Sequence, residues 1–200
     1  MMRNIILGSQ SLRRRELMAG LDVPFSSITI DADESFPAEL QAGDIPLYIS
    51  RVKARAYEAN IAENDLLITS DTIVWLDGRM LGKPQSKEDA KSMLRQLSGQ
   101  THQVYTAVCF TWIDTNTHQP VQDTIVDCTN VVFRELTTEE IDYYVEKYLP
   151  LDKAGAYGVQ EWIGYVGVAR MEGSYFNVMG FPTERIYQWL YANHILDEKG

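Results

Sequence analysis

The chain has 200 residues, of which 45% are hydrophobic and 23% charged, as in one ordinary globular domain. No run approaches the ~18 consecutive apolar residues of a membrane span, and the apolar part of the N-terminus is too short for a signal peptide, so we expect a cytoplasmic protein without membrane contact. The net charge of −10 disfavours binding to a long nucleic acid, which needs clustered Lys and Arg, but leaves binding of a small nucleotide open.

In the N-terminal half, the hydrophobic pattern predicts strands and helices in alternation. Strands are expected over residues 4–7, 25–30, 66–69 and 73–76, and helices over residues 12–19 and 46–61. The helical repeat places Leu12 and Glu16 on one face of the first helix, and it leaves Lys53 off the apolar face of the second. Asp77 and Gly78 form a two-residue hairpin signal, so the chain should turn back there.

In the C-terminal half, capping signals and two long alternating runs set the pattern. Strands that form an extended hairpin are predicted over residues 104–112 and 125–133, and helices over residues 87–98, 141–148 and 183–195. The stretch between Gly155 and Gly180 holds too many glycines for strand or helix interiors, so turns are expected there. Cys109 and Cys128 have no CxxC pair or clustered histidines beside them, which predicts two reduced, buried thiols.

Residues 8–14 end a strand and open a helix, a geometry that directs backbone N–H groups and the positive helix end at whatever lies above the turn. Arg13 and Arg14 are suited to phosphate oxygens because a guanidinium group is planar and donates in pairs, and Lys53 and Lys83 would add positive charge. A solvated helix face with a serine cap is the competing interpretation, and the arginine run by itself favours it.

Asp71 lies among apolar strand residues, where an unpaired carboxylate is costly unless a cation receives it. Carboxylate oxygens hold Mg²⁺ together with phosphates and water, and Glu34 in an acidic loop is the natural second ligand. An Asp71 that only accepts bonds from turn amides remains an alternative. The sequence has no GxxxxGK[ST], GxGxxG or GxSxG motif, which argues against a P-loop, a dinucleotide fold and a serine hydrolase.

Six ordered segments resemble motifs of the Maf family of nucleotide pyrophosphatases: LGSQSLRRREL, SDTIV, LGKP, LSGQTHQVYTAV, LDKAGAYGVQ and GSYFNVMGFP. Together they span almost the whole chain and are far more specific than any one of them. The resemblance implies a single domain over residues 1–200 with an α/β fold like that of the inosine triphosphate pyrophosphatases (the Maf/Ham1 fold). In that fold an extended, curved mixed sheet with flanking helices forms two lobes around a cleft.

The resemblance also implies an activity, the metal-dependent hydrolysis of nucleoside triphosphates to a monophosphate and pyrophosphate, with Mg²⁺ or Mn²⁺ as cofactor. The family's catalytic carboxylate falls on Asp71. The phosphate-facing basic residues fall on Arg13, Arg14, Lys53 and Lys83, and Ser9 and Glu34 match further binding positions, Glu34 as a metal ligand beside Asp71. The branch that prefers dTTP and UTP is marked by an Arg, a Thr and a Gln, which here are Arg13, Thr72 and Gln160.

Two other functions stay open at this point. The chain could be a house-cleaning pyrophosphatase for other non-canonical nucleotides such as inosine triphosphate, or a division-associated protein that acts in septum inhibition by binding a partner. The presence of both Asp71 and Glu34 argues for an enzyme, and a panel of nucleotides would separate the two enzymatic alternatives. A homodimer is expected from the fold alone.

Overall fold

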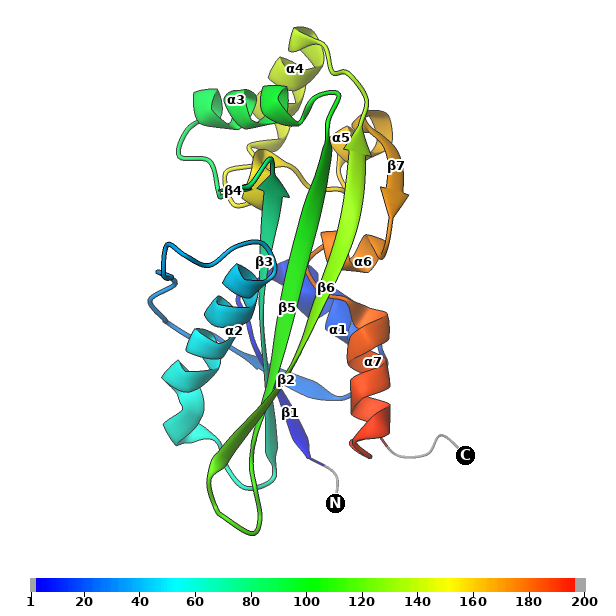
Figure 1. The fold of residues 1–200 in the computed structure, drawn as a ribbon. Helices are drawn as coiled ribbons and strands as arrows, with labels where there is room; N and C mark the ends of the chain where they lie inside the picture. Colours follow the sequence, from blue (N-terminus) through cyan, green and yellow to red (C-terminus); the bar gives the residue numbers. More distant parts are fainter. Residues whose placement is uncertain (1–2, 197–200) are drawn as a thin grey trace.

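A computed structural model describes residues 3–196 and contains a mixed sheet of seven strands with helices on both faces (Figure 1). The strands are β1 (Asn4–Gly8), β2 (Phe25–Ile28), β3 (Asp65–Leu76), β4 (Arg79–Leu81), β5 (Thr101–Ile113), β6 (Pro120–Phe133) and β7 (Val168–Glu172). The helices are α1 (Leu12–Ala19), α2 (Asp44–Tyr57), α3 (Lys87–Leu97), α4 (Thr138–Tyr148), α5 (Trp162–Gly167), α6 (Tyr175–Val178) and α7 (Thr183–Ala192), with 3-10 turns η1 (Glu58–Asn60) and η2 (Ala154–Ala156). Within residues 3–196 no helix is long and apolar enough to cross a membrane.

The sheet is mixed and is built around three long strands. Its order is β2-β1-β3-β5-β6-β7, with β4 paired to β3 beyond the end of β1. β1 runs parallel to β2 and β3, whereas the other pairs are antiparallel. The α/β class, the extended mixed sheet with flanking helices and the long β5–β6 hairpin are therefore confirmed.

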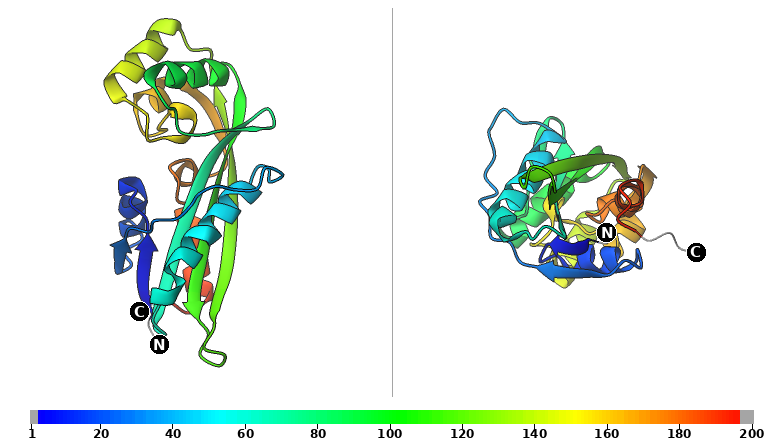
Figure 2. Two further views of the ribbon diagram at one scale, coloured as in Figure 1. Left: turned by 90° about the vertical axis from the view of Figure 1, so that its left-hand side faces the viewer. Right: turned by 90° about the horizontal axis from the view of Figure 1, so that it is seen from below.

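Two hydrophobic clusters lie on the same face of the sheet. The helices that pack around them form the two lobes of the molecule (Figures 1 and 2). In one lobe α1 and α7 pack on the sheet, and Ile68 and Phe110 belong to this cluster. In the other, α3, α4 and the segments after them pack on the far ends of the same strands, around Val74 and Val104. Because β3 and β5 contribute to both clusters, the strands connect the two lobes directly.

The second helix covers the opposite face of the sheet, in an orientation that the hydrophobic repeat did not predict. Ser50 and Ala54 are buried against β3, whereas Ala56 is exposed, and the side chain of Lys53 turns toward the sheet with only 13% exposure. The expectation that Lys53 lies off the core face was wrong. The reason is that β3 presents polar side chains to this face of α2. One of them is Thr69, whose Oγ1 donates to the Ser50 carbonyl at 2.7 Å.

Other sequence expectations also need correction. In α1, Leu12 is 63% exposed and Met18 is fully buried, because the sheet meets the helix on the Met18 side. The glycine-rich stretch contains α5, β7 and α6 in addition to turns. Gly164 lies inside α5, and the position requires glycine because a Cβ there would come within 1.8 Å of the Val159 carbonyl oxygen. Both cysteines are free thiols, but only Cys109 is buried and Cys128 is exposed.

Candidate active site

The candidate site lies where the edge of β3 is left open. β1 pairs with β3 as far as Thr69, and β4 pairs with it from Val74 onward. Between those positions, at Ser70 to Ile73, the strand has no partner on that edge within residues 3–196. Because side chains alternate along a strand, Asp71 faces α2 while Thr72 faces the side of α1 and α6. Both side chains line one cavity of about 450 Å³.

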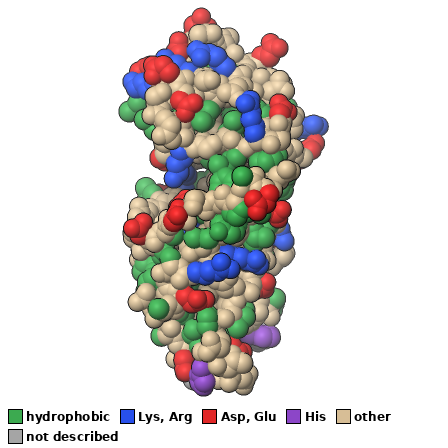
Figure 3. Space-filling view, turned by 60° about the vertical axis from the view of Figure 1, so that its left-hand side comes forward, with side chains coloured by type: hydrophobic (Ala, Val, Ile, Leu, Met, Phe, Trp, Pro, Cys, Tyr) green, Lys and Arg blue, Asp and Glu red, His purple; other side chains and the backbone are tan. Residues whose placement is uncertain are grey.

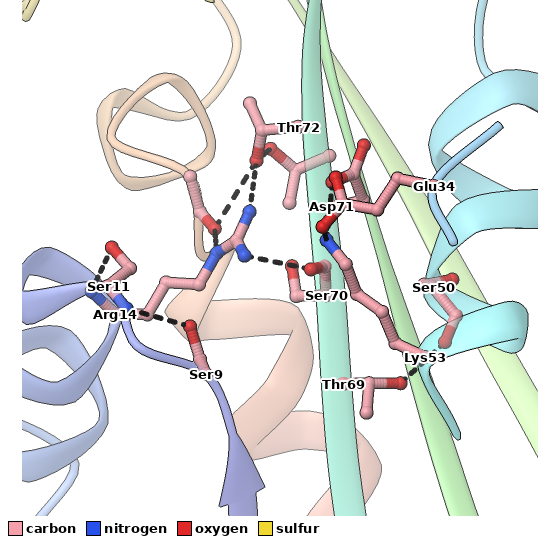
Figure 4. Close-up of polar contacts among 12 residues, drawn as sticks. Ser9, Ser11, Arg14, Glu34, Ser50, Lys53, Thr69, Ser70, Asp71 and Thr72 are labelled. Carbon is pink, nitrogen blue, oxygen red and sulfur yellow. Dashed lines mark hydrogen bonds and ion pairs between the residues drawn. The ribbon is translucent and has the colours of Figure 1, made fainter. Parts of the chain in front are cut away.

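Asp71 is paired with a lysine from α2 (Figure 4). Lys53 Nζ lies 2.8 Å from Asp71 Oδ1 and 3.1 Å from Glu34 Oε1, so one ammonium group holds two carboxylates together. Asp71 is 9% exposed and Glu34 lies in the exposed loop before α2. The structure thus brings together three residues that are separated in the sequence by up to 37 positions (71 − 34).

These two carboxylates also suit a divalent cation. Hard carboxylate oxygens are the ligands Mg²⁺ prefers, and in phosphoryl sites it is bound by one or two of them with phosphate and water oxygens. Asp71 and Glu34 converge on a single cationic group at the cavity wall, so they can face one ion. Within the described residues no cluster of three or more His, Cys, Asp or Glu side chains is suited to a metal.

Arg14 reaches across from α1, but most of its donors are already used by the protein. Its Nε donates to the Gly180 carbonyl at 2.8 Å, Nη1 to the Ser70 carbonyl at 2.8 Å and Nη2 to Thr72 Oγ1 at 3.0 Å (Figure 4). Burial lowers the pKa of Arg14, and the negative charge of Asp71 opposes that shift. Arg14 lines the cavity and also fastens α1 to the open edge of β3.

Thr72 belongs to the same network. Thr106 Oγ1 donates to the Asn177 carbonyl at 2.9 Å and lies 3.0 Å from Thr72 Oγ1. Thr72 Oγ1 accepts from Arg14, and its own proton has Thr106 Oγ1 at 3.0 Å and the Gly180 carbonyl at 3.5 Å as acceptors. Its hydroxyl position is set by β5 and α6, and its free lone pair and methyl group remain for the cavity.

The opposite wall of the cavity comes from the other lobe. Lys83, Gln160, Asp152 and Lys153 all line it, together with Tyr157. Figure 3 shows a notch between the two lobes, with basic and acidic side chains at its border. In the segment LDKAGAYGVQ only Gln160 was predicted as a site residue, and Asp152 and Lys153 were not. The available signal was the pair of charged residues directly before a segment of glycine and alanine.

An ion pair joins the two walls at the mouth of the cavity. Arg13 Nη1 on α1 donates to Asp152 Oδ2 at 3.3 Å. Lys153 Nζ lies 2.7 Å from Asp152 Oδ1. Although burial raises the pKa of Asp152, these two cations outweigh it and hold the pKa below its ordinary value. Ser9, the remaining predicted residue, lies at the end of β1, where its Oγ accepts from the Ser11 backbone N–H at 3.2 Å.

Comparison with known proteins agrees with the sequence motifs. A family model described as Maf-like protein matches residues 4–193. The dTTP/UTP pyrophosphatase of Bacteroides thetaiotaomicron is 53% identical over 92% of this chain and 92% of its own length, and that of Porphyromonas gingivalis is 48% identical over 93% and 92%. The solved structure of a HAM1 protein from Coxiella burnetii is 16% identical and covers 96% of this chain and 100% of its own, with a TM-score of 0.48.

Proposed function

The chain belongs to the Maf family, and we propose that it hydrolyses dTTP and UTP to the nucleoside monophosphate and pyrophosphate. The observation that carries the proposal is the pairing of Asp71 with Lys53 at the open edge of β3, inside a cavity lined by further basic side chains. The relatives that share about half of its residues are named for this activity, which supports the choice of dTTP and UTP.

Hydrolysis breaks the anhydride between the α- and β-phosphates and requires a base for the attacking water. Asp71 is the proposed base: its carboxylate faces the cavity, and Lys53 orients it through Oδ1, which leaves Oδ2 available for the proton of water. Lys53 and Lys83 supply positive charge for the phosphates, where negative charge builds up as the bond breaks. The remaining N–H groups of Arg14 add donors with the planar geometry that phosphate accepts.

A divalent cation, Mg²⁺ or Mn²⁺, is part of this proposal. Asp71 and Glu34 would hold it, and when bound it neutralises phosphate charge and lowers the pKa of water. In the described structure Lys53 draws these two carboxylates together, so the protein supplies a prepared pair of acidic groups. Ser9 at the end of β1 would contribute to phosphate binding beside the first turn of α1.

The base of the nucleotide is assigned to the part of the cavity lined by the three residues that mark the dTTP and UTP branch. Arg13, Thr72 and Gln160 line the same cavity and come from three separate segments of the chain. Their donors and acceptors can pair with the oxygen and N–H groups on the edge of a uracil or thymine ring. A site built on hydrogen bonds rejects a base that leaves those groups unpaired, which would discriminate against purines by ~10²-fold or more.

The test is pyrophosphate release from a panel of canonical and modified nucleotides, with Mg²⁺ or Mn²⁺ and with EDTA. We expect dTTP and UTP to have the highest kcat/KM, EDTA to abolish release, and added cation to restore it. Full activity in EDTA would disprove the metal dependence. A preference for inosine triphosphate would disprove the substrate assignment, and no release from any nucleotide would disprove the enzymatic function.

A further inference from the structure

Gln160 lies in a tight turn, and contacts of its neighbour Glu161 stabilise that turn. The backbone N–H of Glu161 donates to the Gly158 carbonyl at 3.0 Å, which closes the turn. Tyr144 of α4, which is fully buried, donates its hydroxyl proton to Glu161 Oε2 and accepts from the Gly158 backbone N–H at 3.1 Å. One buried tyrosine therefore holds both ends of the turn that carries Gln160.

The Glu161 carboxylate and the Gln160 amide both lie close to Gly158. A Cβ placed on Gly158 would lie 2.9 Å from Glu161 Cδ and 3.2 Å from Gln160 Nε2. The two side-chain ends thus occupy the same side of the turn, over a glycine that leaves them the room. If the carboxylate moves, the space open to the Gln160 amide changes with it, because packed side chains leave few voids.

The same carboxylate continues through a chain of charges to the other lobe. Glu161 Oε1 lies 3.2 Å from Lys153 Nζ, and Lys153 is only 8% exposed. Lys153 in turn binds Asp152, which binds Arg13 on α1. This row of ion pairs ends at Arg13, and Gln160 is the neighbour of Glu161 at its other end. Arg13 and Gln160 are two of the three side chains proposed to face the base. Asp152 and Lys153 line the cavity, whereas Glu161 is not among the described residues that line it.

We propose that Glu161 is a positioning residue that sets the base specificity of the site by fixing Gln160 directly and Arg13 through Lys153 and Asp152. This inference rests on the proposed function and extends it beyond the three side chains that face the base. Its physical basis is that a charged acceptor makes hydrogen bonds about twice as strong as a neutral one. A neutral group of the same shape at position 161 should hold the turn less firmly and place the Gln160 amide less accurately.

The experiment compares Glu161→Gln with Glu140→Gln. Glu140 also forms an ion pair, with Arg134, and belongs to the N-cap of α4 in the same lobe. Glu140→Gln therefore removes one charged contact, as Glu161→Gln does, but leaves the turn that carries Gln160 unchanged. For Glu161→Gln we expect kcat/KM for UTP to fall by about tenfold or more, mainly through KM, because a small misplacement of a binding group is costly. The rate with GTP should stay within about twofold, since the phosphate contacts remain.

Binding of UMP, measured by calorimetry without turnover, should weaken by a similar factor in Glu161→Gln and stay unchanged in Glu140→Gln. A folded Glu161→Gln protein that keeps the wild-type ratio of UTP to GTP activity and the wild-type affinity for UMP would overturn the inference. If that variant does not fold, Tyr144→Phe removes the donor to Glu161 while leaving every charge in place, and an unchanged ratio there is equally decisive. Failure of wild type to release pyrophosphate counts against the proposed function alone, because UMP affinity still tests the positioning.

Discussion

Among single residues, Asp71 has the surroundings that a catalytic carboxylate needs, since it is nearly buried, faces the cavity and is oriented by one lysine. Asp71→Asn keeps the volume and can still accept a bond from Lys53, but it removes the base and a hard metal ligand. We expect pyrophosphate release to fall by ~10²–10⁴ with the melting temperature little changed. Asp77→Asn, in the exposed β3–β4 turn, is the control and should have wild-type turnover. Near-normal activity of Asp71→Asn would remove Asp71 from the mechanism.

Gln160 is the side chain of the second lobe that we propose reads the base. Gln160→Ala should lower kcat/KM for UTP much more than the rate with poor substrates, because the contacts to the triphosphate stay in place. The alternative is that Gln160 only stabilises its turn, which predicts a lower melting temperature and an unchanged ranking of substrates. Melting curves and a nucleotide panel on the same variant distinguish the two.

His102 gives the protein a pH-dependent contribution to stability. It is fully buried with its Nε2 2.7 Å from the Tyr157 hydroxyl, and its Nδ1 has no hydrogen-bond partner among residues 3–196. Burial lowers its pKa from 6.5 to about 4, so the unfolded chain binds the proton more tightly than the native protein. The resulting stability is present above pH 6.5 and is lost as the pH falls toward 4, by ~3 kcal/mol at most.

The measurement is urea unfolding of wild type and His102→Gln between pH 7 and pH 4. Glutamine can keep a hydrogen bond to Tyr157 but does not titrate, so the variant should lose less stability across this range than wild type. The comparison cancels the contribution of the carboxylates, which both proteins share. Parallel curves for the two proteins would show that His102 does not carry this effect.

At the scale of secondary structure, α4 shows how local signals specify an element. Thr137 Oγ1 accepts from the Glu140 backbone N–H at 3.2 Å, and the Glu140 carboxylate accepts from the Thr137 backbone N–H at 2.9 Å. Thr137→Ala should therefore cost ~1 kcal/mol of unfolding free energy. Thr138→Ala, one residue later and outside the cap, should cost little or nothing. Equal losses in the two variants would mean that the cap does not stabilise the helix.

For the molecule as a whole, the main feature is that β3 and β5 are shared between the two lobes. β3 places Ile68 in one hydrophobic cluster and Val74 in the other, and β5 does the same with Phe110 and Val104. We propose that residues 1–200 form a single domain, since neither cluster can be exposed without breaking the strands of the other. Calorimetry should show one transition with equal calorimetric and van't Hoff enthalpies. Two separate transitions would show that the lobes are independent domains.

The sequence by itself determined the features that depend on neighbouring residues. The caps at Ser86 and Thr137, the Asp77-Gly78 hairpin and the alternation in β5 and β6 were all predictable, because a cap, a two-residue turn and a period of two involve only nearby positions. The Maf family was also predictable, since its motifs are read directly from the chain and the family model matches residues 4–193.

Only the tertiary structure decided which side chains meet. The helical repeat predicted that Lys53 lies off the core face, yet in the structure Lys53 binds Asp71 of β3. The repeat cannot predict this contact because it contains no information about a partner 18 positions away. In the same way, three donors of Arg14 bind acceptors of the protein itself. Arg13 forms an ion pair with Asp152, which lies 139 positions away in the sequence. The burial and pairing of a polar group depend on what a distant segment presents to it, and that is settled only when the sheet and its covering helices are assembled.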